Sequence, residues 1–193
     1  MARRLCMLIR VAFSLISFSA MASGATNLVG SVAASPVFTT LDGRYVAISQ
    51  YYAPATNGPA CESENVVLLD FMSLTCAPCK KELPVFLETV REAVRKAPKN
   101  RKVQSFVVSL DPLSAKERLR DFMVQHNVNL ESELLLDPYH KAAAKFNVTS
   151  IPRTFVISGK GIIVCDIEGA TEQYKEQLER GINAALGGIE PSL

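Results

Sequence analysis

The 193-residue chain has no tryptophan and only two histidines, His126 and His140. A structural zinc site takes four cysteine or histidine ligands, but the chain has one CxxC pair and no histidines at ligand spacing. Attachment of a c-type haem requires a histidine directly after the second cysteine of CxxC, where Lys80 stands. These absences argue against zinc and haem, and we expect no resident cofactor.

Long apolar runs are absent after residue 22, since no later stretch approaches the roughly 18 apolar residues of a membrane span. Residues 1–22 combine a basic head, an apolar stretch and a small-x-small end. This pattern predicts a secretory signal cut after Ala22, with which Cys6 would leave. Because Arg10 interrupts the apolar stretch, an uncleaved membrane anchor is the alternative, so the chain is expected to be exported to the periplasm or anchored facing it.

The chain also lacks a strong charge of either sign. Its formal net charge is +2, which becomes −1 when residues 1–22 and their three arginines are removed. Basic residues do cluster over 91–102, but Glu88 and Glu92 are interleaved with them, which is typical of a solvated helix face. The charge therefore argues against nucleic acid as a partner.

The most informative motif that is present is Cys76-Ala77-Pro78-Cys79, which follows the apolar run 66–71 and opens a stretch of helical periodicity. The first turn of a helix leaves N–H groups unpaired and carries a positive partial charge, so a thiol there ionises easily. Such thiols titrate at roughly 3.5–7.5 rather than about 8.5. We expect Cys76 to be the thiolate nucleophile and Cys79 to resolve the mixed disulfide formed at Cys76.

Two further cysteines, Cys61 and Cys165, remain after signal removal. Disulfides persist outside the cytosol, but spacing cannot establish connectivity. A structural disulfide, a second redox pair and two unpaired thiols stay open.

The rest of the sequence predicts one α/β domain in which a mixed sheet is flanked by helices. Asp42-Gly43 between two short apolar runs indicates a hairpin, and Ser114 with Glu117 indicates a capping box. The expected elements are a hairpin over 37–48, strands over 66–72 and 106–110, helices over 79–96, 114–126 and 138–146, a second hairpin over 153–167, and a helix over 171–186.

Four features in this order resemble the exported thiol-disulfide oxidoreductases of the TlpA/ResA type, which are thioredoxin-fold relatives of the AhpC/TSA proteins. They are the CxxC, Pro84 eight residues after its first cysteine, the segment 150–157 around Pro152, and the glycines 159, 161 and 169. The resemblance covers residues 36–187 and implies a thioredoxin-like domain with an added N-terminal hairpin and a helical insert. Residues 23–35 are then a flexible N-terminal segment, and 188–193 a tail.

The resemblance also implies roles for individual residues. Pro152 would be cis and lie against the cysteines, so that the backbone at Ile151 pairs with a substrate strand. Ala77 and Pro78 would contact the substrate as well. Asp70 would be a buried acid that takes the proton of Cys79, with a pKa raised by burial.

The function implied is reduction of disulfides in exported proteins, apocytochromes c being one class, with electrons from a membrane thiol-disulfide donor. The Ala-Pro dipeptide between the cysteines adds no positive charge to the thiolate, which favours a reductant. The chain departs from the TlpA/ResA pattern in having Leu74-Thr75 instead of a tryptophan before Cys76. A peroxiredoxin-like peroxidase, with Ser73 three residues before Cys76, and a Cu(I)-binding chaperone remain alternatives.

Overall fold

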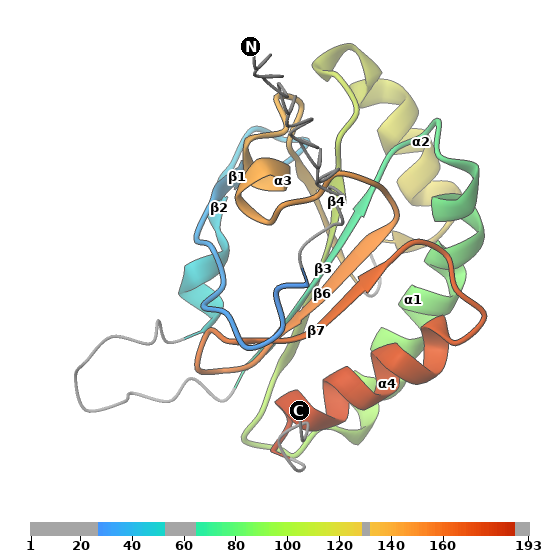
Figure 1. Cartoon of the computed structure of the whole chain (residues 1–193). Coiled ribbons are helices and arrows are strands. Elements are labelled where there is room, and N and C mark those ends of the chain that lie inside the picture. Colours follow the sequence, from blue (N-terminus) through green and yellow to red (C-terminus); the bar gives the residue numbers. More distant parts are fainter. Residues whose placement is uncertain (1–26, 53–64, 129–131, 188–193) are drawn as a thin grey trace, which may run out of the picture.

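A seven-stranded mixed sheet forms the centre of the protein (Figure 1). The computed structural model describes residues 27–52, 65–128 and 132–187, and the predicted signal 1–22, Cys61 and the tail 188–193 lie outside these ranges. The strand order is β2-β1-β5-β4-β3-β6-β7, in which β3, β4 and β5 are parallel and the other pairs are antiparallel. The strands are β1 (Val37–Thr39), β2 (Tyr45–Ala47), β3 (Val66–Met72), β4 (Val103–Ser109), β5 (Glu133–Leu136), β6 (Arg153–Ile157) and β7 (Ile163–Glu168).

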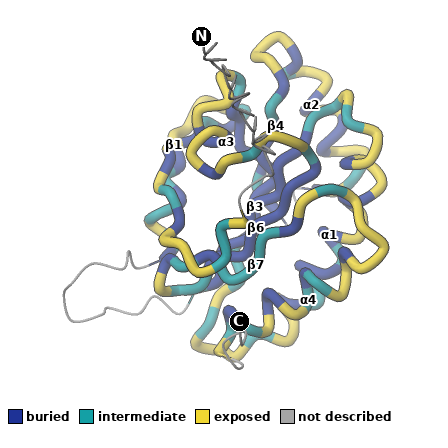
Figure 2. Tube along the Cα trace, in the orientation of Figure 1, coloured by how far each residue is buried: buried dark blue, intermediate teal, exposed yellow. Residues whose placement is uncertain are grey.

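Helices cover both faces of this sheet (Figure 1). They are α1 (Ala77–Lys96), α2 (Lys116–Gln125), α3 (Lys141–Lys145) and α4 (Tyr174–Ala185), with 3-10 turns η1 (Ile48–Tyr51) and η2 (Leu113–Ala115). One apolar core lies between the sheet and α1, α2 and α4, and a second core lies on the opposite face with α3 and η1. Buried residues accordingly concentrate on the central strands (Figure 2).

The central strand β3 is buried along its whole length. Both faces are covered, so its sequence reads as a continuous apolar run instead of an alternating one. Alternate residues face alternate cores: Leu68 and Met72 belong to the core under α1, and Leu69 and Phe71 to the core under α3. Asp70 shares the face of Leu68 and Met72, which places its carboxyl under α1.

Strand β5 is an element that the sequence reading missed. Its apolar residues are three consecutive leucines, which favour helix by intrinsic propensity. The strand forms because β5 pairs with β4 on one side and with β1 on the other. Pairing partners, which a short run does not reveal, decide its conformation.

The predicted capping box at Ser114 and Glu117 is wrong. Pro112 starts a 3-10 turn in which the N–H of Ala115 donates to its carbonyl at 2.8 Å, so Ser114 lies within the turn. Helix α2 then begins at Lys116 without a side-chain cap.

Helix α3 begins later than the predicted start at Pro138. A turn closed by the His140 N–H on the Asp137 carbonyl precedes it, and His140 has a positive φ of 54°. Asp137 still accepts from the N–H groups of Lys141 and Ala143 at 2.9 and 2.8 Å, so it does bind the helix N-terminus as an acceptor.

The N-terminal segment 27–35 is bonded to β7 and the turn before it. The N–H of Gly30 donates to the Ile163 carbonyl and that of Ala33 to the Gly161 carbonyl, both at 2.8 Å. The N–H of Leu28 donates to Asp166 Oδ2 at 2.9 Å. These bonds cover the outer edge of β7, so residues 27–35 of the segment predicted over 23–35 are hydrogen-bonded to the sheet.

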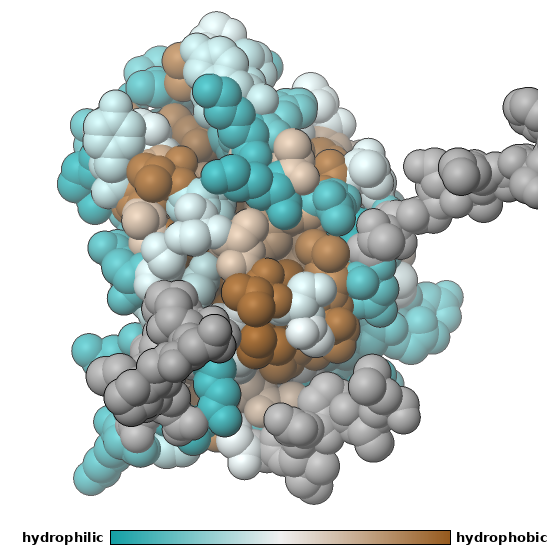
Figure 3. All heavy atoms as spheres, turned by 60° about the vertical axis from the view of Figure 1, so that its left-hand side comes forward, coloured by the Kyte–Doolittle hydropathy of each residue, from teal (hydrophilic) through white to brown (hydrophobic). Residues whose placement is uncertain are grey.

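Some apolar side chains on the N-terminal elements are exposed, Val32, Val37 and Tyr45 among them. Figure 3 turns this side of the molecule forward and shows apolar atoms gathered on it. Exposed apolar side chains in small numbers are ordinary on a folded domain. None of the helices in the described ranges is both long and apolar enough to cross a bilayer.

Candidate active site

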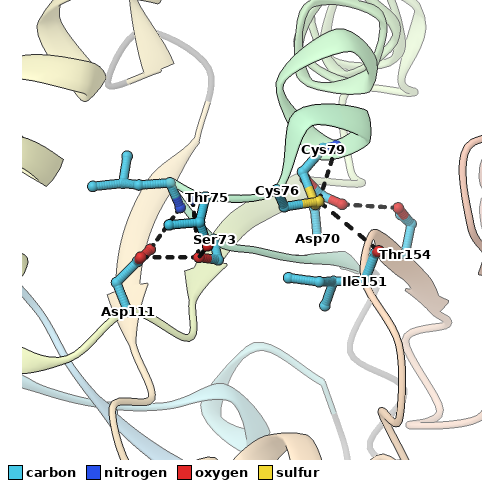
Figure 4. Close-up of a disulfide and its surroundings, with 9 residues drawn as sticks. Asp70, Ser73, Thr75, Cys76, Cys79, Asp111, Ile151 and Thr154 are labelled. Atoms are coloured by element: carbon cyan, nitrogen blue, oxygen red, sulfur yellow. Dashed lines mark hydrogen bonds between the residues drawn. A yellow bond between two sulfur atoms is a disulfide. The ribbon is translucent and has the colours of Figure 1, made fainter.

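A disulfide joins Cys76 and Cys79 where β3 gives way to α1 (Figure 4). Cys76 is the N-cap of α1, and its Sγ accepts from the N–H of Cys79 at 3.1 Å. Helix α1 begins at Ala77, two residues before the predicted start, because Pro78 in the first turn is pre-set for helical φ and needs no N–H partner. The unpaired N–H groups of this turn can stabilise negative charge on Cys76 sulfur.

The two sulfurs differ in access. Cys76 is half-buried, whereas Cys79 is only 2% exposed. Ala77 and Pro78, predicted to contact substrate, are exposed beside Cys76. A substrate disulfide can therefore reach Cys76 directly and Cys79 only through it.

The loop before β6 closes the site on its other side. The Ile151–Pro152 bond is cis, the conformation that the resemblance implied. The Ile151 carbonyl lies 3.9 Å from Cys76 Sγ (Figure 4). The N–H of Gly169 fixes the loop by donating to the Pro152 carbonyl at 2.8 Å. Predicted residues from β3, α1 and this loop, far apart in sequence, thus meet at one place.

Asp70 lies on the α1 side of β3, next to the disulfide (Figure 4). It is 2% exposed, and its Oδ1 accepts from the Thr154 hydroxyl at 3.0 Å. Burial raises the pKa of Asp70 to about 7, and the Thr154 hydrogen bond opposes the rise. Asp70 is thus the buried acid that the sequence predicted, and it changes charge near neutral pH.

Glu82 is a second buried carboxyl that the sequence reading missed. It is 6% exposed, and its Oε2 has no hydrogen-bond partner among the described residues. Burial raises the pKa of Glu82 to about 8, the charge of Asp70 adds to the rise, and the hydrogen bond with Tyr174 opposes it. The signal was available: Glu82 occupies an inward position three residues after Cys79, on the same helix face as Phe86.

Tyr174, at the start of α4, connects these groups. Its hydroxyl lies 3.1 Å from that of Thr154. Burial raises its pKa well above the usual value, and the neighbouring charges of Asp70 and Glu82 add to the rise. Tyr174 therefore stays neutral, and the two carboxyls are the groups that can exchange a proton near neutral pH.

The turn between β3 and Cys76 is held by Asp111, which follows β4. Asp111 Oδ1 accepts from the Ser73 hydroxyl and Oδ2 from the N–H of Leu74, each at 2.9 Å (Figure 4). The Ser73 hydroxyl, whose position three residues before Cys76 the peroxidase alternative cites, thus donates to Asp111 in this structure.

The second face of the sheet carries a buried ion pair next to Pro152. Arg153 Nε and Nη2 each donate to Asp166 at 2.8 Å, and their side chains are 1% and 2% exposed. Arg153 also lies over the Phe155 ring, 5.4 Å from its centroid. The same Asp166 carboxylate accepts from the N–H of Leu28, so Asp166 connects Arg153, which follows Pro152, to the N-terminal segment.

Cys165 on β7 is half-buried and forms no disulfide with another cysteine of the described residues, whereas Cys61 lies outside them. Burial raises the pKa of Cys165 to about 11, so little thiolate forms at neutral pH. Within the part of the chain that the structure describes, no group of three or more His, Cys, Asp or Glu side chains is placed to hold a metal ion.

A CxxC disulfide at a helix N-terminus, next to a cis proline at the same end of a mixed sheet, defines a redox protein of the thioredoxin fold. Comparison with known proteins agrees with this class. The sequence profile of the AhpC/TSA family matches residues 38–165, and the chain belongs to that family.

Individual relatives point the same way. The chain is 25% identical over 151 residues to the thiol-disulfide oxidoreductase ResA of Bacillus thuringiensis subsp. konkukian, covering 78% of this chain and 75% of that one. It is similar to a Chlorobium tepidum structure described as thiol:disulfide interchange protein DsbE, with 25% identity, a TM-score of 0.64 and coverage of 82% and 98%. A Bacteroides thetaiotaomicron structure described as a protein disulfide isomerase shares the fold, with 24% identity, a TM-score of 0.63 and coverage of 82% and 89%.

The names of these relatives favour the predicted thiol-disulfide oxidoreductase over the peroxidase and metal-binding alternatives. The thioredoxin-type α/β fold expected from the sequence is confirmed by the structural likeness.

Proposed function

We propose that this protein is an exported thiol-disulfide oxidoreductase that reduces disulfides in other proteins. The observation that carries the proposal is the difference in access between the sulfurs: Cys76 is reachable at the N-cap of α1, and Cys79 is buried behind it. Such a pair can form a mixed disulfide through one sulfur and resolve it with the other.

In the reaction, the Cys76 thiolate attacks a substrate disulfide, which forms a mixed disulfide and releases one substrate thiolate. Cys79 then loses its proton and attacks the Cys76 sulfur. The second substrate thiolate leaves, and the Cys76–Cys79 disulfide forms, which is the state of this structure. Two electrons pass from the protein dithiol to the substrate disulfide.

The proton of Cys79 needs a buried acceptor, because that sulfur is shielded from solvent. Asp70, with its pKa near 7, is the acceptor that we assign. Glu82, whose pKa is about 8, shares its environment and can hold the proton while Asp70 is ionised. Ile151, beside cis-Pro152, offers its backbone to an extended substrate segment over Cys76.

Return to the dithiol state requires an external thiol donor, which we propose is a membrane thiol-disulfide protein facing the periplasm. The signal-like pattern of residues 1–22 supports export. Disulfides in exported apocytochromes c are one substrate class that fits the resemblance to ResA-type proteins.

Trapping with Cys79→Ser tests the exchange. Without the resolving thiol, the variant should accumulate mixed disulfides through Cys76 when it is expressed in its host, and these should disappear on reduction. Non-reducing gels and mass spectrometry identify the trapped proteins. Cys76→Ser and the distant Cys165→Ser serve as controls that should trap nothing. Equal trapping by Cys79→Ser and by the double variant that also lacks Cys76 would contradict the assignment.

The direction of electron flow is tested by the reduction potential of the Cys76–Cys79 pair. We expect a value near the thioredoxin end of the range, about −270 mV, because Ala77 and Pro78 add no charge that stabilises the thiolate. Equilibration with glutathione or dithiothreitol buffers measures it. A potential above about −150 mV would instead assign an oxidase.

A further inference from the structure

In the turn that delivers Cys76 to α1, Leu74 packs against the core under α1, whereas Ser73 and Thr75 are polar. Ser73 and Leu74 are half-buried, and Thr75 is exposed. The N–H of Cys76 closes the turn by donating to the Ser73 carbonyl at 3.0 Å. The position of the reactive sulfur therefore depends in part on what holds Ser73.

Asp111 holds it from the neighbouring strand end. This carboxylate is 5% exposed and accepts from the Ser73 hydroxyl, the Leu74 N–H and the Ser109 hydroxyl at 2.9, 2.9 and 2.8 Å. Within the described residues no lysine or arginine forms an ion pair with it, so these hydrogen bonds satisfy the buried group. Ser73 and Leu74 belong to the turn, whereas Ser109 ends β4 and anchors the carboxylate to the sheet.

The connection continues from Ser73 to the cysteine. Since the Ser73 hydroxyl donates to Asp111, its lone pairs face Thr75, whose N–H lies 3.2 Å away and whose hydroxyl lies 3.0 Å away. The next residue is Cys76, whose Sγ must point at the Cys79 N–H to cap α1. A displaced turn would misdirect this sulfur and remove the N–H that stabilises its thiolate.

We propose that Asp111 is a positioning residue for the nucleophile: acting through Ser73 and Leu74, it holds Cys76 at the N-cap of α1. The proposal concerns the same site as the proposed oxidoreductase and rests on that function only for its effect on turnover. Its effect on the thiol itself can be measured whether or not the protein reduces other proteins.

The direction in which substitution of Asp111 changes the Cys76 thiol pKa distinguishes a positioning role from a direct effect of the Asp111 charge. Removal of a negative charge near a thiol, taken alone, stabilises the thiolate and lowers the thiol pKa. Loss of the helix-cap geometry raises that pKa. Asp111→Ala removes both the charge and the three acceptor contacts, so a rise in the Cys76 pKa can come only from misplacement.

The experiment measures alkylation of reduced full-length protein by iodoacetamide as a function of pH, with Cys76 modification quantified by mass spectrometry. We expect Asp111→Ala to move the pH profile of Cys76 alkylation upward by about half a pH unit or more, which slows alkylation about threefold at pH values below the midpoint of the profile, where the thiolate is the minor form. Ser73→Ala, which deletes one hydroxyl and no charge, should slow it in the same direction. Asp121→Ala, at an exposed acid on α2, should leave the profile unchanged.

Faster alkylation of Asp111→Ala would show a charge effect only and would overturn the proposal, as would an unchanged profile. If Asp111→Ala does not fold, Ser73→Ala decides in the same way. The positioning role and the proposed function can also fail separately. If alkylation slows in both variants but the wild-type protein has no reductase activity, the positioning role is supported and only the proposed function is rejected.

Discussion

Replacing Asp70 with asparagine should raise the free energy of unfolding at pH 8 by up to about 4 kcal/mol. Burial raises the pKa of Asp70 from 3.8 to about 7, so the folded protein keeps a proton that the unfolded chain releases. Between about pH 4 and 7 each pH unit therefore favours the unfolded state by about 1.4 kcal/mol. Asparagine can still accept the Thr154 hydrogen bond and does not carry this cost.

The size of this effect depends on pH. Below about pH 4 both states hold the proton, so wild type and Asp70→Asn should be equally stable with respect to this group. The advantage of the variant should grow as pH rises and be complete above about pH 7. Urea unfolding of the oxidised proteins at pH 4 and pH 8 measures it, with Asp121→Asn as the exposed control. A gain of equal size at both pH values would show that desolvation of the charge is not its cause.

The same substitution should cost activity. If Asp70 accepts the Cys79 proton, the rate of disulfide reduction by wild type should rise with pH through about 7, and Asp70→Asn should lose that rise. The acid thus destabilises the fold in return for a proton acceptor beside a buried thiol. Such a conflict between stability and activity is characteristic of functional sites.

The second large effect is expected at Arg153. Its guanidinium is 1% exposed and binds the buried Asp166 carboxylate through two hydrogen bonds. Arg153→Met should lower the free energy of unfolding by about 3–5 kcal/mol, because it leaves Asp166 buried without its cation. Chemical denaturation of the oxidised protein measures the loss.

Two further variants identify the cause. Arg153→Met combined with Asp166→Leu should recover part of the loss, because no buried charge is then left unpaired. Arg120→Met, which breaks the exposed pair with Glu117, should leave the free energy of unfolding nearly unchanged, because water screens that pair. A loss at Arg153 no larger than that at Arg120 would contradict a stabilising role for the buried pair.

Several parts of the fold were predictable because the evidence for them is local. Strand β3 is a continuous apolar run with the predicted bounds Val66–Met72, and Asp42-Gly43 does close a hairpin, with Gly43 at a φ of 87°. The CxxC lies at the strand–helix boundary as its flanking sequence indicated. The predictions failed where local propensity and tertiary pairing disagree, as in β5, or where a proline displaces a helix start, as before α2.

The features of the candidate site likewise fall into those that were predicted and those that only the structure revealed. The sequence by itself determined the thiol pair, because CxxC is a residue type at a fixed spacing, and its resemblance to ResA-type proteins predicted the proline beside the pair and the acid on the strand beneath. Only the tertiary structure decided that Glu82 faces Asp70, that Asp111 holds the turn before Cys76 and that Arg153 pairs with Asp166. Desolvation and hydrogen bonding depend on which side chains from distant segments enclose a group, and a linear sequence does not state those neighbours.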